Sequence, residues 1–157
     1  MKKNISVLLL ALCFVFAVSG CSDTQDVGGK THKAFTFSVE TGDKVRVELD
    51  TTGGYDLSSN LPFEISKNGS TLSQGIFIEA DQFESYAEAV NSDANAKIIE
   101  TNTKDSNRYV FWSYNDSEYN IVVLIGDSNT GILLGNAISE DSARECFERL
   151  SISLAKE

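Results

Sequence analysis

Apolar side chains recur at every second position in four segments of the first half of the chain, which is the period of β-strands with one buried face. The segments are 35–39, 45–49, 61–65 and 72–78, the last with Gln74 at one of the alternating positions. Gly42-Asp43 separates the first two segments and Asn68-Gly69 the last two. Both dipeptides suit tight turns, so each pair of segments predicts a hairpin. Residues 51–60 are polar and rich in turn formers, and they predict a loop.

The period changes to that of a helix at Asp81. Asp81 and Glu84 have the spacing of a capping box, and a short apolar stripe follows them as far as Asn91. A second helix is expected to begin after Ser139, a favoured N-cap residue, and to continue through Leu154. Its apolar stripe consists of Ala143, Cys146, Phe147, Leu150 and Leu154, and its wet face of Glu145, Glu148 and Arg149.

Four further strands are predicted between the two helices. They are 97–102, 108–115, 119–126 and 131–136. Short polar turns join them, so neighbouring strands are expected to be antiparallel. The predicted fold class is therefore α+β, with a mainly antiparallel sheet of about eight strands and two helices packed on one face.

Both faces of the predicted four-strand meander are apolar at their centres. With Tyr114 opposite Tyr119, the face that carries Trp112 has the longer apolar column, so both helices are expected to cover it. The N-terminal hairpin then covers part or all of the other face. A part that stays open would be a contact patch for a partner. The candidate residues of this patch are Tyr109, Phe111 and, at its rim, Tyr55.

The first twenty residues have the form of a secretory signal peptide. Lys2 and Lys3 precede an apolar run over 5–18 that is short for a permanent membrane span. The run ends in Val18-Ser19-Gly20-Cys21, which resembles the lipobox of bacterial lipoproteins. The resemblance implies that the chain is cut before Cys21 and that the Cys21 thiol is acylated. The alternative is a conventional signal peptide followed by an incidental cysteine.

The expected domain organisation follows from that cut. Residues 1–20 form the signal peptide, 21–33 the lipidated cysteine and a flexible tether, and 34–157 a single α+β domain. Two or three acyl chains would anchor the protein stably on the extracytoplasmic side of the bacterial cell membrane. Ser22 stands where the lipoprotein family usually has Asp as an inner-membrane retention signal. The expected location is therefore the outer membrane if the envelope has two membranes.

The run from Leu61 to Leu154 is similar in element order to PsbP-like extracytoplasmic domains. The predicted order is two strands, a helix, four strands and a C-terminal helix. The resemblance implies a non-enzymatic accessory or assembly role, although topology alone does not establish a function.

The charge balance disfavours one class of partner. The 157 residues include 13 basic and 23 acidic side chains, for a formal net charge of −10, which argues against a nucleic-acid surface. The expected partners are the membrane, through the lipid anchor, and an unknown envelope protein. Of the three cysteines, only Cys146 would remain a thiol after cleavage and acylation, so no disulfide within the chain is expected. Its position on an apolar helix stripe predicts burial rather than redox chemistry.

Residue types that catalysis requires are scarce. The one histidine, His32, falls in the predicted tether, which argues against a Ser-His or Cys-His pair and against a metal centre of several imidazoles. Residues 127–131 begin like a calcium loop, but Ile138 stands where a bidentate Glu is required, so a hairpin turn is expected. No catalytic residue, cofactor site or metal site is predicted.

One loop permits another interpretation. Asp50-Thr51-Thr52-Gly53-Gly54-Tyr55 resembles the binding loop of chagasin-like cysteine-protease inhibitors, but it lacks the proline of that loop and has an extra glycine. The resemblance implies a protease inhibitor, and a small-ligand binder is a further alternative. The preferred hypothesis from the sequence is a membrane-anchored, extracytoplasmic, non-catalytic binding or accessory module.

Overall fold

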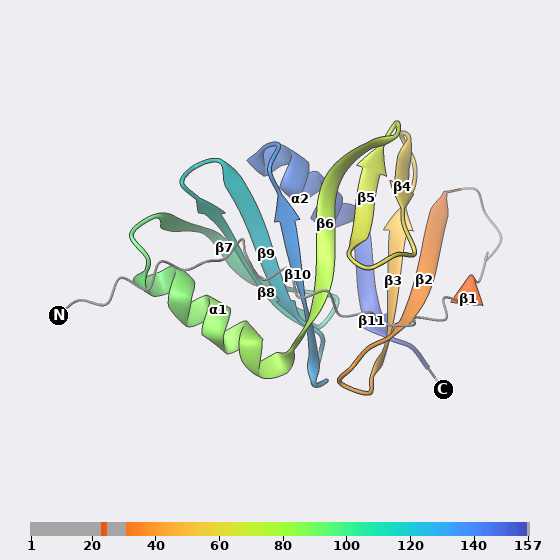
Figure 1. Ribbon diagram of the computed structural model, residues 1–157, viewed down its shortest axis with the longest axis horizontal. Coiled ribbons are helices and arrows are strands. Elements are labelled where there is room, and N and C mark those ends of the chain that lie inside the picture. The colour runs from red at the N-terminus through yellow and green to blue at the C-terminus, as the bar shows by residue number, and fades with distance from the viewer. Residues whose placement is uncertain (1–22, 25–30, 157) are drawn as a thin grey trace.

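The computed structural model describes residues 23–24 and 31–156. These residues form two antiparallel β-sheets and two α-helices, so the fold is α+β (Figure 1). The predicted signal peptide and Cys21 lie outside the described residues.

The smaller sheet has four strands in the order β1-β2-β3-β11. They are β1 (Asp23–Thr24), β2 (His32–Ser38), β3 (Lys44–Asp50) and β11 (Leu150–Leu154). The predicted hairpin is confirmed, because Phe35 of β2 pairs with Val47 of β3 and both side chains are buried. β2 begins at His32, two residues before the predicted start of the domain.

The larger sheet has seven strands in the order β4-β5-β6-β10-β9-β8-β7. They are β4 (Tyr55–Leu57), β5 (Phe63–Lys67), β6 (Ser70–Glu79), β7 (Ala96–Lys104), β8 (Asn107–Tyr114), β9 (Glu118–Leu124) and β10 (Thr130–Asn136). The predicted tight turn joins β5 to β6, with Asn68 at φ 51° and Gly69 at φ 83°. β4 is an additional strand inside the segment predicted to be a loop.

The two helices lie on opposite faces of the larger sheet, which corrects the prediction that both cover one face (Figure 1). Helix α1 (Ala80–Ser92) packs on the face that carries Trp112. Helix α2 (Glu140–Arg149) packs on the other face, which the smaller sheet also covers. Ser139 caps α2 as predicted, whereas α1 begins after Glu79 rather than Asp81.

The strand register differs by one residue from the prediction. Tyr114 pairs with Glu118, and Phe111 with Ile121, because the connecting turn spans three residues, 115–117. A shift of one residue exchanges the two faces of a strand. Ile121 and Val123 therefore join Phe111 in the core between the sheets, which becomes the larger of the two apolar clusters.

The C-terminal helix is shorter than predicted. It ends at Arg149, and Leu150–Leu154 form β11 against β3. Leu150 and Ile152 alternate with Ser151 and Ser153, a strand pattern that the helical spacing of Leu150 and Leu154 obscures. Pairing with β3 buries Ile152 to 4% exposure and leaves Leu154 44% exposed.

The predicted contact patch is not present on the surface. Tyr109, Phe111 and Tyr55 are 8%, 2% and 4% exposed. The reason is that α2 and the smaller sheet cover this face, and the ring of Phe147 packs edge-on against Tyr109 at 4.8 Å. Cys146 is buried in the same core, as predicted.

Candidate functional site

An open cleft of about 490 Å³ lies where the outer face of the smaller sheet meets the end of α2. The residues that line it are His32, Glu48, Asp50, Glu145, Glu148, Arg149 and Ser151. Four carboxylates and one guanidinium line the cleft, and Arg46 brings a second guanidinium by pairing with Glu48 at 2.5 Å, so the cleft carries a net negative charge. Such a lining attracts cations and repels anions.

Strand pairing brings these residues together from distant parts of the chain. His32 of β2 lies opposite Asp50 of β3, and Ser151 of β11 lies opposite Glu48 of β3. Arg149 ends α2 immediately before β11 begins. The cleft therefore depends on β11, a strand that the sequence pattern did not predict.

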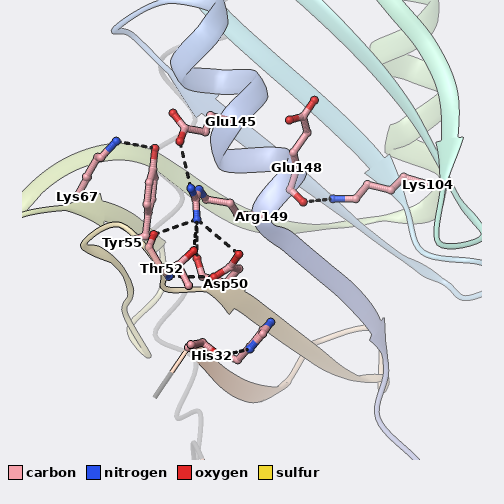
Figure 2. Close-up of polar contacts among 10 residues, drawn as sticks. His32, Asp50, Thr52, Tyr55, Lys67, Lys104, Glu145, Glu148 and Arg149 are labelled. Carbon is pink, nitrogen blue, oxygen red and sulfur yellow. Dashed lines mark hydrogen bonds and ion pairs between the residues drawn. The ribbon is translucent and has the colours of Figure 1, made fainter. Parts of the chain in front are cut away.

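Arg149 connects α2 to the loop between β3 and β4 (Figure 2). Its Nη1 donates to the carbonyl oxygen and the hydroxyl of Thr52, at 3.0 and 3.1 Å, and lies 3.6 Å from a carboxylate oxygen of Asp50. Its Nη2 donates to Glu145 Oε1 at 3.3 Å. The guanidinium carbon lies 4.1 Å from the centre of the Tyr55 ring, a cation–π distance.

Tyr55 forms the base of this cluster. Lys67 Nζ lies 4.7 Å from the ring centre and donates to the Tyr55 hydroxyl at 3.4 Å (Figure 2). Burial, followed by the nearby Glu145 carboxylate, raises the pKa of Tyr55 to about 12. Since this phenol stays protonated near neutral pH, Tyr55 does not exchange protons there. It provides a ring and a hydroxyl that contact the cationic groups of Arg149 and Lys67.

The carboxylates of the cleft are held in their charged form. Hydrogen bonds from Thr52, one of them from its backbone amide to Asp50 Oδ1 at 2.9 Å, lower the pKa of Asp50. The Tyr55 hydroxyl and the Arg149 guanidinium lower the pKa of Glu145. Both shifts move away from neutrality, whereas a general acid or base works best with a pKa near the working pH.

The loop over 51–54, which resembles an inhibitor loop, lies beside the cleft. Thr52, Gly53 and Gly54 are exposed, and Arg149 holds the loop at Thr52. Gly54 has a φ of +86°, and a Cβ there would lie 2.2 Å from Asn68 Oδ1. Only glycine fits this position without a rearrangement.

The site therefore contains few of the residues predicted to be functional. His32, assigned to the tether, lines the cleft, while Tyr55 lies beneath it and Tyr109 and Phe111 belong to the core. One signal in the sequence pointed to the site. The charged residues Glu145, Glu148 and Arg149 share one face of α2, but such a pattern is equally typical of a solvated helix surface.

The described residues contain no group of three or more His, Cys, Asp or Glu side chains placed to hold a metal ion. No helix among them is long and apolar enough to cross a membrane. No family model matches the chain, and neither a curated protein nor a solved structure matches it.

Proposed function

We propose that this protein is a bacterial lipoprotein whose folded domain acts by binding rather than by catalysis. The N-terminal support is Val18-Ser19-Gly20-Cys21 after a basic and then apolar segment. In this proposal Cys21 carries the lipid, and the domain is displayed on the extracytoplasmic side of the membrane. Replacing Cys21 with Ser removes the thiol that accepts the lipid, so the protein should leave the detergent phase or remain uncleaved. A cleaved Cys21→Ser protein that still enters the detergent phase would contradict the anchor.

The acidic cleft is the proposed contact site, and its occupant is a cationic group on an envelope partner. The observation that carries this proposal is that an open cleft is lined by four carboxylates, with the pKa values of Asp50 and Glu145 lowered. Ionised carboxylates that are already fixed by neighbours attract a cation without reorganising. The pKa shifts support electrostatic binding and do not favour acid–base chemistry.

A charge-reversal pair tests the cleft. Glu148 lines the cleft and is exposed on α2, and Glu88 is exposed on α1, which packs on the opposite face of the larger sheet. Glu148→Lys should weaken binding of a tetralysine peptide to the detergent-solubilised protein about tenfold at low salt, and Glu88→Lys should change it far less. Calorimetric titration measures both. If the two substitutions weaken binding equally, the peptide is attracted by the overall negative charge of the protein. That result would contradict the cleft as the binding site.

The exposed loop over 51–54 supports a second candidate, a cysteine-protease inhibitor. Arg149 holds this loop, and a loop fixed in advance loses little entropy when it binds. Titration of papain distinguishes the candidates. Stoichiometric inhibition that Gly54→Val abolishes would favour the inhibitor, whereas papain activity unchanged at a large excess of protein would exclude it for this protease.

A further inference from the structure

The short strand β1 pairs with the middle of β2. Asp23 lies opposite Thr36, and Thr24 lies opposite Phe35, in an antiparallel arrangement. Moving along β1 from Thr24 to Asp23 therefore follows β2 toward its last residue, Ser38. The N-terminal end of β1 therefore points toward the end of the domain that contains the β2–β3 turn.

Cys21 precedes Asp23 by two residues, which limits their separation to about 7 Å. We propose that the pairing of β1 with β2 orients the domain on the membrane, with the β2–β3 turn toward the bilayer and the cleft away from it. This proposal rests on the proposed acylation of Cys21. In this arrangement a short connection takes the place of the flexible tether expected over 21–33, because β1 attaches the chain to the domain directly after the anchor.

The cleft lies at the opposite end of β2. His32 is the first residue of β2 and pairs with Asp50, the last residue of β3. Six residue steps separate His32 from Ser38, which is about 20 Å along an extended strand. The acidic cleft would therefore stand clear of the lipid headgroups and open toward other proteins of the envelope.

The end that faces the bilayer is polar. Glu40 in the β2–β3 turn is exposed, and the Asp43 carboxylate accepts a hydrogen bond from the Thr130 hydroxyl at 2.6 Å. Lys44, the first residue of β3, is also exposed at this end, so acidic and basic side chains face the headgroups together. The turn therefore lies near the membrane surface without entering it, and the acyl chains provide the attachment.

Disulfide trapping tests the pairing of β1 with β2 in the full-length lipidated protein. Asp23→Cys with Thr36→Cys places two thiols directly opposite each other, and Asp23→Cys with Ser38→Cys displaces them by two residues. A paired strand predicts that the first variant oxidises about tenfold faster, because disulfides need closely spaced Cα atoms. Equal rates for the two variants would show an unpaired tether and overturn the proposal.

Fluorescence quenching tests the orientation on vesicles whose lipids carry a nitroxide quencher on the headgroup. A fluorophore is attached to Glu40→Cys in the β2–β3 turn or to Ser151→Cys in the cleft, both at exposed positions. We expect the label at residue 40 to be quenched and the label at residue 151 to be unaffected. If the protein floats with the vesicles but both labels are quenched equally, the proposed orientation is wrong and the lipid anchor is unaffected. Protein that does not float contradicts the lipid anchor, and this proposal with it.

Discussion

Lys104 fixes the end of α2. Its Nζ donates to the carbonyl oxygens of Phe147, Glu148 and Leu150, at 2.6, 3.0 and 2.7 Å. These carbonyls lie at the helix C-terminus, where backbone acceptors lack partners within the helix and a positive charge is favourable. The lysine thus holds the junction between α2 and β11, on which the cleft is built.

Lys104→Met should lower the free energy of unfolding by about 2 kcal/mol, because three hydrogen bonds from a charged donor are lost while the aliphatic stem is kept. Lys97→Met is the matched control on the same strand, since Lys97 is exposed. Its effect should stay within about 0.5 kcal/mol. Urea denaturation of both variants measures the difference. Equal stability of the two variants would mean that the Lys104 contacts contribute nothing.

Glu100 makes the stability of the domain sensitive to acid. The Tyr109 hydroxyl donates to its carboxylate, and Arg144 Nη1 lies 2.7 Å from Oε2. These contacts lower the pKa of Glu100 below its ordinary value of 4.5. A carboxyl whose pKa is lower in the folded state stabilises the fold above pH 4.5, and this stabilisation is lost as the pH falls through the folded value.

Glu100→Gln should therefore be less stable than the wild type at pH 7 and should lose less stability between pH 5 and pH 3. The free energies of unfolding of the two proteins should converge at the acidic end. Urea denaturation at several pH values measures both trends. Parallel curves over the whole range would contradict the role assigned to Glu100.

Cys146 should react only when the domain unfolds. Its side chain is 1% exposed, and burial raises the pKa of its thiol, which lowers the fraction of reactive thiolate. A thiol reagent should therefore label the native protein slowly and the urea-unfolded protein within minutes. Mass spectrometry measures the labelled fraction. Rapid labelling of the native domain would place the thiol at the surface.

At the scale of elements, the sequence predicts the strands and helices better than their partners. Nearly all the alternating segments are strands, and Ser139 is the cap of α2. The three-residue turn at 115–117 determines the register of β8 and β9. The sequence around Tyr114 and Tyr119 does not indicate how long this turn is. β4 escaped prediction because it has only three residues, Tyr55–Leu57, between stretches of turn-forming residues.

β11 provides the sharpest test at this scale, because a helix and a strand bury different side chains. Ile152 lies in the core and Leu154 is 44% exposed, whereas a continued helix would bury Leu154 on its apolar stripe. Ile152→Ala should cost about 2–4 kcal/mol and Leu154→Ala less than about 1 kcal/mol. Thermal or urea denaturation measures both. The reverse order would favour the helix.

For the whole molecule, the two sheets are joined by polar contacts as well as by the core. Asn107 of β8 is buried, donates to the carbonyl of Ile152 at 2.8 Å, and accepts from the Gly126 amide at 3.0 Å. The cleft likewise combines His32 with Arg149, from opposite ends of the described chain. Contacts between such distant residues depend on which strands pair, and hydrophobic periodicity carries no information about that choice.

The proposed location of the domain on the extracytoplasmic side of the membrane depends on a lipid attached to Cys21. Mass spectrometry of the N-terminal tryptic peptide from protein isolated in detergent tests it most directly. We expect a peptide over 21–30 that begins at Cys21 and carries a diacylglyceryl group on the thiol. An N-terminus at another residue, or a peptide with an unmodified Cys21, would contradict the lipid attachment.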